Sequence, residues 1–180
     1  MIIGVYGKIG SGKSFAASYI CKKYKYKEYS LGDEVRIQAK KDKVEPNRKN
    51  LSKISSTYRK KYGEDYWVKR LVKKIKSKKI LISGIRSYTD YLYLKKIYPK
   101  LFLIEIYSTD NIRFNRLLNR NRIGDPKNKF EFIKQNLTEY VNFSGVYKLE
   151  KNVDTKIENN ETPDKLYKNI DKIINQKSLY

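Results

Sequence analysis

Short apolar runs alternate with helical patterns along the whole chain. Residues 2–6, 79–83 and 101–107 are short, mostly apolar runs, which are typical of strands that are buried on both faces. Weaker strands are expected over 28–31 and 153–157. Between these runs, apolar residues recur at intervals of three and four, as on a helix that buries one face. This alternation predicts βαβ units, and therefore a five-stranded parallel sheet with helices on both faces.

Several of the expected helices begin at recognisable signals. The first covers 13–24, and its expected inner positions are Phe15, Ala16, Tyr19 and Ile20. The next begins after Ser30, with Asp33 three residues later in the spacing of a capping box. Pro46 ends that helix, and Asn47 is placed to cap the following one. Further helices are expected over 87–98, 109–121 and 129–141, and after Pro163.

The loop after the first strand carries the chemistry of the sequence. Residues 7–14, GKIGSGKS, fit the pattern G-x-x-x-x-G-K-[ST]. Glycines allow backbone amides to surround a phosphate, and a helix N-terminus favours an anion. Lys13 adds a charge near the β- and γ-phosphates, and Ser14 can ligate magnesium. With a strand before the loop and a helix after it, we expect a three-layer P-loop NTPase fold in a single domain over 1–180.

Composition limits the chemistry that this loop can serve. The chain has 41 Lys and Arg against 19 Asp and Glu, a net charge of +22 that favours anionic partners. It has no histidine, and Cys21 is its one cysteine, so imidazole catalysis, an intrachain disulfide and a cysteine-based metal site are excluded. No run approaches the ~20 apolar residues that span a bilayer, and the first residues do not resemble a signal peptide. We expect a cytoplasmic protein without a membrane partner, either a monomer or a homodimer.

Two arginines follow the ends of strands, where the ligands of a parallel sheet bind. In SLGDEVR, Asp33 and Arg36 share the first turn of a helix, and this arginine could face the phosphate held by the loop. In ILISGIRS, Arg86 stands just beyond the third strand. Ser83 occupies the strand end at which P-loop proteins usually carry an acidic residue that orients magnesium.

A further group of arginines lies in RFNRLLNRNRIGDPKN. Arg113, Arg116 and Arg120 recur at helical spacing and form one stripe, and Arg122 follows in the loop. Leu117 and Leu118 are the expected buried side. In a chain so rich in lysine, a guanidinium stripe indicates phosphate, because arginine grips phosphate oxygens in a bidentate manner. The IGDP turn is suited to be the hinge of a lid over about 113–128.

The order of these motifs resembles adenylate-kinase-like nucleoside monophosphate kinases. It is most similar to the archaeal adenylate-kinase-related proteins, a group also similar to dephospho-CoA kinase, and the likeness runs from Met1 to about Ile174. The resemblance implies Mg²⁺-dependent transfer of the γ-phosphoryl group of ATP to a nucleoside monophosphate such as AMP or dAMP. It also implies an acceptor-binding helical part over about 32–77. Ser83 departs from the family, which shows Asp there, and Asp33 or Asp125 could compensate.

The resemblance also assigns roles to individual residues. It assigns phosphoryl transfer to Lys13, Arg86, Arg120 and Arg122. It assigns ATP binding to Gly7, Lys8, Gly10, Ser11, Gly12, Lys13, Ser14, Arg116, Asn159, Asn160 and Thr162. It assigns acceptor binding to Asp33, Arg36, Gly84 and Arg86. Ser14 is the expected ligand of Mg²⁺.

Other P-loop activities stay open at this point. The chain lacks the Asn-Lys-x-Asp motif of GTPases and is short for an AAA module, while a sulfotransferase-like activity remains an alternative. A dephospho-CoA-kinase-like enzyme would phosphorylate a ribose hydroxyl, for which it needs a base that Ser83 does not supply. An ATPase bound to RNA or ribosomes would use the +22 charge, although the sequence shows no nucleic-acid-binding motif and its tyrosines are scattered.

Overall fold

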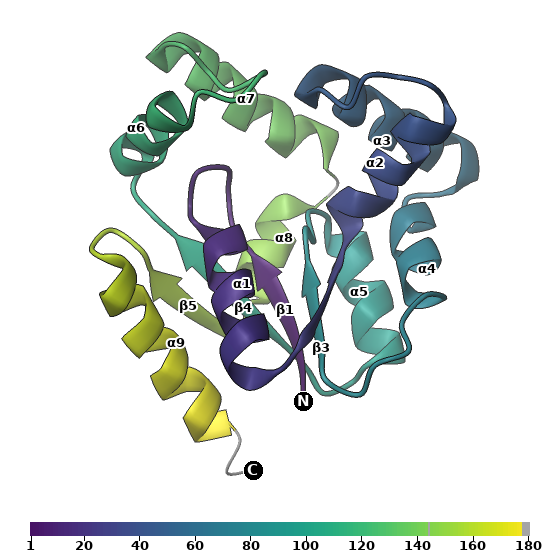
Figure 1. The fold of residues 1–180 in the computed structure, drawn as a ribbon. Coiled ribbons are helices and arrows are strands. Elements are labelled where there is room, and N and C mark those ends of the chain that lie inside the picture. The colour runs from purple at the N-terminus through teal and green to yellow at the C-terminus, as the bar shows by residue number, and fades with distance from the viewer. Residues whose placement is uncertain (144, 178–180) are drawn as a thin grey trace.

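Five parallel strands form one sheet in the order β2-β3-β1-β4-β5 in the computed structural model, which describes residues 1–143 and 145–177 (Figure 1). The strands are β1 (Ile2–Tyr6), β2 (Lys27–Ser30), β3 (Ile80–Ser83), β4 (Leu101–Tyr107) and β5 (Thr155–Glu158). β1 lies at the centre, where Gly4 pairs with Ile82 on one side and with Leu103 on the other. The apolar start of the chain is therefore the middle of the sheet, as its sequence predicts.

Helices cover both faces of this sheet and extend beyond its carboxyl edge. They are α1 (Lys13–Tyr24), α2 (Leu31–Lys41), α3 (Arg48–Tyr62), α4 (Tyr66–Val72), α5 (Tyr88–Ile97), α6 (Asp110–Arg120), α7 (Lys129–Asn142), α8 (Val146–Lys151) and α9 (Pro163–Lys177). The predicted three-layer α/β architecture is confirmed. Asn47 caps α3 as expected, because its side chain accepts a hydrogen bond from the Asn50 amide at 3.0 Å. No helix of the described residues is long and apolar enough to cross a membrane.

Alternate residues of the strands supply two separate cores. On one face, Ile3 and Val5 of β1 pack with Ile20 of α1 and Ile170 of α9, and all four side chains are fully buried. On the other face, Ile82 of β3 packs in the cluster that contains Trp67 of α4, Leu94 of α5 and Leu149 of α8. This period-two division follows from the geometry of a strand, whose successive side chains point to opposite faces.

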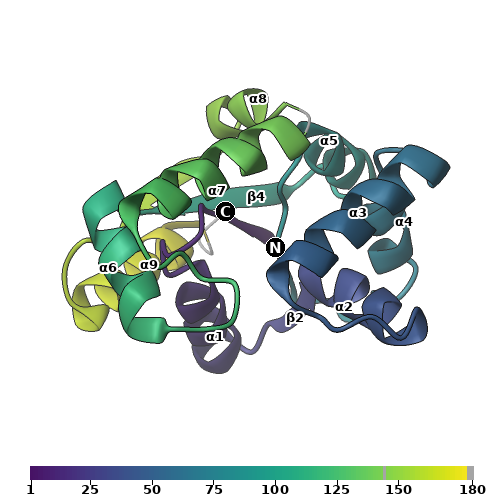
Figure 2. The ribbon, with the colours of Figure 1, turned by 90° about the horizontal axis from the view of Figure 1, so that it is seen from above.

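A smaller core joins α6 and α7 above the carboxyl edge of the sheet. It contains Phe114, Leu117 and Phe132, with Ile9 of the glycine-rich loop packed against it. Figure 2 looks down on this edge and shows α6 and α7 on one side, with α3 across from α7. The two helices and the loop between them therefore form a cover beside the ends of β1, β3 and β4.

The structure corrects several local expectations. Ser30 does not cap α2 through its side chain, because Asp33 pairs with Arg36 instead. Phe15 is 47 % exposed and stacks on Tyr167 of α9, so it is an edge residue rather than an inner one. Leu118 is likewise exposed, and the buried side of α6 is formed by Phe114 and Leu117. The helix α8 was not expected from the sequence.

Candidate functional site

The glycine-rich loop between β1 and α1 has the backbone form of a phosphate cradle. Gly10 and Gly12 adopt φ values of 79° and 91°, a left-handed region that side chains rarely occupy. A Cβ at Gly10 would lie 2.7 Å from the Arg113 carbonyl oxygen, and one at Gly12 would collide with the Asn159 amide. The Ser11 amide donates to the Lys8 carbonyl at 3.2 Å and closes the turn. The sequence pattern and the required backbone geometry therefore agree.

Side chains directly after β4 and β5 anchor this loop. The Asn159 amide donates to the Ser11 carbonyl at 2.8 Å, and the Ser108 hydroxyl donates to the Asn159 carbonyl at 2.5 Å. Arg116 donates to that hydroxyl at 3.0 Å, and burial lowers the pKa of its guanidinium. Asn159 and Arg116 are thus connected through Ser108, and Asn159 bonds to the loop directly. Asn160 accepts from the Thr109 amide at 3.0 Å in the neighbouring segment.

Lys13 begins α1 and lies at the centre of a group of cations. Its ammonium donates to the Lys8 carbonyl at 3.4 Å. Burial lowers its pKa to about 8, and the positive charges of Arg86, Arg48 and Arg120 act in the same direction, while Glu139 opposes them. A lysine ammonium is a point charge suited to phosphate, and the neighbouring arginines add to the effect of burial on its pKa.

The Glu139 carboxylate of α7 bridges two of these arginines. Its Oε1 accepts from Arg86 Nη1 and from Arg48 Nη2, each at 3.0 Å. Gln135, one turn earlier on α7, also accepts from Arg48, at 2.7 Å. The same carboxylate lines a pocket together with Lys13, Arg86, Asn136 and Tyr140. Arg48, at the start of α3, is a member of this cluster that sequence reasoning missed.

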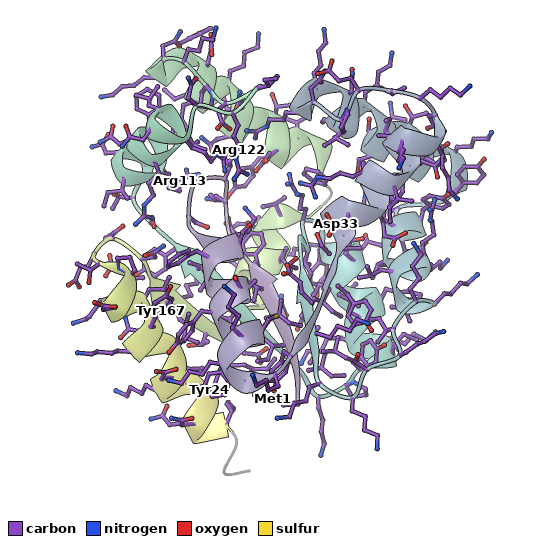
Figure 3. The ribbon with its side chains drawn as sticks, in the orientation of Figure 1. Met1, Tyr24, Asp33, Arg113, Arg122 and Tyr167 are labelled. Carbon is purple, nitrogen blue, oxygen red and sulfur yellow. The ribbon has the colours of Figure 1, made fainter. Side chains whose placement is uncertain are left out.

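The end of α6 carries the remaining arginines of the cover. Arg120 pairs with Asp125 through two hydrogen bonds of 2.8 and 2.5 Å, and this contact lowers the pKa of the carboxyl group. The Arg122 amide donates to the same carboxylate at 3.1 Å, while its side chain is exposed. Figure 3 shows Arg113 and Arg122 on the α6 side of the loop, with Asp33 on the opposite, α2 side.

Arg113 is the one member of the expected stripe that is sealed inside. It is 2 % exposed and donates to the Ile9 carbonyl at 2.9 Å and to Asn136 at 3.1 Å. It also pairs with Asp110 at 2.7 Å. The arginines of the stripe therefore have different roles. Arg113 supports the loop and α7 through buried hydrogen bonds, while Arg120 lies in the cation cluster.

The expected acceptor side is built where β3 and α2 meet. A Cβ at Gly84 would lie 3.2 Å from the Gly32 amide, so the turn after β3 packs directly on the first turn of α2. Asp33 and Arg36 are both exposed and pair at 2.6 Å. The motifs SLGD and SGIR are therefore neighbours in space, although the chain places them about fifty residues apart.

Ser83 meets a carboxylate that sequence reasoning did not name. Its hydroxyl donates to Glu28 Oε1 at 2.5 Å from the adjacent strand β2. Asp33 and Asp125, which the sequence offers as substitutes for the missing Asp, pair with Arg36 and Arg120 in this structure. Serine and carboxylate oxygens suit Mg²⁺, which is usually held by one or two protein oxygens together with substrate phosphates. Residues 1–143 and 145–177 assemble no group of three acidic, cysteine or histidine side chains that could hold a metal ion by themselves.

Comparisons with known proteins identify the families to which the chain belongs. A family model described as an AAA domain matches residues 6–133, so the length of the chain does not separate it from that class. The UPF0200 protein of Staphylothermus marinus is 32 % identical over 140 residues, which is 77 % of this chain and 73 % of that protein. The UPF0200 protein MJ1399 of Methanocaldococcus jannaschii is 35 % identical over 144 residues, with 77 % and 72 % covered.

Solved structures share the whole fold at low identity. A shikimate kinase from Bacteroides thetaiotaomicron has a TM-score of 0.63 at 11 % identity, and 99 % of this chain and 98 % of that chain are covered. A sugar kinase from Janibacter sp. HTCC2649 has a TM-score of 0.56 at 13 % identity, with 97 % and 94 % covered. The architecture is that of P-loop kinases, with a nucleotide-binding loop. On the sequence matches, the chain belongs to the UPF0200 family and to the family of the AAA domain model.

Proposed function

We propose that this protein is a Mg²⁺-dependent kinase that transfers the γ-phosphoryl group of ATP to a nucleoside monophosphate of the AMP or dAMP type. The observation that carries this proposal is that Lys13 and Arg86 line one pocket with the Glu139 carboxylate, which accepts hydrogen bonds from both Arg86 and Arg48 at 3.0 Å. Arg120, at the end of α6, adds a further positive charge that acts on Lys13. These arginines come from the acceptor-side helix α3, the end of β3 and the cover helix α6. A site that receives two phosphate groups face to face requires this arrangement.

In this proposal the P-loop amides and Lys13 hold the β- and γ-phosphates of ATP. Arg86 and Arg36 hold the acceptor phosphate, while Arg120 and Arg122 neutralise the charge of the group in transfer. Ser14, exposed in the first turn of α1, would hold Mg²⁺, whose role is to neutralise the phosphates. A phosphate acceptor is already ionised at neutral pH, so no general base is needed, which suits a chain without histidine.

The cover formed by α6 and α7 would exclude water during transfer. Its helices pack on the loop through Phe114, Phe132 and Ile9, so they lie against the phosphate site rather than away from it. Excluding water strengthens the arginine–phosphate interactions and prevents hydrolysis of ATP. Catalysis then rests on positioning and charge neutralisation, the two main contributions to phosphoryl transfer.

One observation favours a second acceptor class. Glu28, held by Ser83 at 2.5 Å, is a carboxylate at the strand end where a base for a hydroxyl acceptor would stand. A dephospho-CoA-kinase-like transfer to a ribose hydroxyl therefore remains the second candidate. The two candidates differ in their need for a base, because only the hydroxyl must lose a proton.

A coupled assay of ATP with a panel of nucleoside monophosphates and dephospho-CoA distinguishes these functions. We expect diphosphate formation with AMP or dAMP, loss of turnover in Lys13→Ala, and a raised KM for the acceptor in Arg86→Ala with the KM for ATP unchanged. Transfer to none of the acceptors, with hydrolysis of ATP alone, would refute the kinase. A raised KM for ATP in Arg86→Ala would refute the division into donor and acceptor sides.

A further inference from the structure

Glu139 stands in the site as an anion that the chain itself supplies. It projects from the last two turns of α7, is 25 % exposed, and places one oxygen at 3.0 Å from both Arg48 and Arg86. One oxygen that accepts from two guanidinium groups of separate elements is the geometry of a phosphate oxygen between arginines. The carboxylate thus occupies the position that an anionic ligand would take.

The charges around this position do not balance. Lys13, Arg48, Arg86 and Arg120 influence one another electrostatically, and Glu139 and Asp125 are the carboxylates that oppose them. These four cations and two carboxylates leave two positive charges uncompensated. A phosphate monoester carries close to two negative charges at neutral pH. Replacing one carboxylate by such a group lowers the net charge of the cluster from two positive charges to about one.

The bridge also closes the site. Arg48 at the start of α3 holds α7 through Glu139 and through Gln135, and Gln135 in turn donates to the Gly124 carbonyl at 3.1 Å. On the other side, Arg86 lies over the Phe143 ring, which follows α7, at 5.4 Å from its centroid. The acceptor-side helix and the cover are therefore linked through the same two arginines that face the P-loop.

We propose that Arg48 joins Arg86 in the binding site for the acceptor's phosphate, and that the Glu139 carboxylate occupies this site until the phosphate displaces it. This inference rests on the proposed function for the identity of the acceptor, but the anion exchange itself needs no turnover. Glu139 is an internal competitor: it keeps the two arginines paired and the cover closed in the free protein. Binding of the acceptor exchanges one anion for another at the two arginines.

The test measures binding rather than catalysis. Calorimetric titration of the full chain with AMP, and separately with inorganic phosphate, compares wild type with Glu139→Gln. Removing the competitor should tighten both ligands by about tenfold, because the binding-competent state is then populated without displacement. Glu131→Gln is the matched control. It removes the same charge from the same helix, and glutamine also serves at the N3 position that Glu131 occupies.

A second pair of variants separates competition from a general change of charge. Arg48→Ala should weaken AMP binding, and adding Glu139→Gln to Arg48→Ala should give much less than the tenfold gain seen in wild type. Unchanged or weaker binding in Glu139→Gln would overturn the inference, as would an equal gain in Glu131→Gln. If the kinase assay fails while Glu139→Gln still tightens phosphate binding, the anion exchange stands and the proposed acceptor is wrong.

Discussion

The low pKa of Lys13 makes nucleotide binding a proton-linked event. Burial and three neighbouring arginines hold this pKa at about 8, below its ordinary value of 10.5. A triphosphate placed against the ammonium adds negative charge and raises the pKa again. Binding therefore draws a proton onto every Lys13 that was neutral beforehand. Since the bound state has the higher pKa, affinity for ATP must fall as the pH rises through and above 8.

The size of the effect follows from that pKa. In the free protein about one tenth of the Lys13 side chains are neutral at pH 7, about half at pH 8 and about nine tenths at pH 9. If ATP restores the ordinary pKa, binding takes up ~0.1, ~0.5 and ~0.9 of a proton at these three values. The dissociation constant should rise about twofold at pH 8 and about tenfold at pH 9, relative to its low-pH limit.

Isothermal titration calorimetry in two buffers with different ionisation enthalpies measures this proton uptake directly. Lys13→Arg is the control, because a guanidinium stays charged throughout this range. It should retain a cation at the loop and lose the proton uptake. Binding heats at pH 8 and 9 that are the same in both buffers would refute the reasoning. So would an uptake that persists undiminished in Lys13→Arg, since the proton would then be bound elsewhere.

Three further changes test the framework around the site. Trp67→Ala should lower the free energy of unfolding by about 3–5 kcal/mol, because the ring is 1 % exposed. Urea denaturation measures this loss of stability, and a loss under ~1 kcal/mol would contradict the observed packing. Asp90→Asn should cost about 3–5 kcal/mol in the same assay, because it strands the buried Arg59 that it pairs with at 2.8 Å. Gly12→Ala should weaken ATP binding roughly tenfold or more, because the added methyl group collides with Asn159 and a φ of 91° strains alanine. Calorimetric titration with ATP measures the change in affinity, and wild-type affinity in the variant would disprove the prediction.

The sheet and the loop could be predicted from the sequence because their signals are short patterns of neighbouring residues. Three strands are continuous apolar runs, and Gly10 and Gly12 stand where the backbone needs positive φ. Asn47 could be recognised as a cap because the group it binds is three residues away. In each case the interaction and its signal lie within one element or one turn.

The cation cluster could be predicted only in part, because its members owe their roles to distant partners. Arg48 is separated from Glu139 by 91 residues, and Ser83 from Glu28 by 55. Nothing in the sequence around Glu139 marks it as the carboxylate that meets these arginines. One local signal does exist for Arg48. Like the expected site arginines, it is an arginine in a chain whose other basic residues are mostly lysines.

The contacts of Arg48 that join α3 to α7 have a consequence for turnover in the proposed reaction. They tie α3 to α7 next to the pocket that Lys13, Arg86 and Glu139 line, because Arg48 donates to both Gln135 and Glu139. In the proposed reaction, each acceptor that binds would break this contact and each product that leaves would let it form again, a motion of the kind that occurs on microsecond-to-millisecond timescales. Product release in that reaction would therefore be coupled to movement of α7.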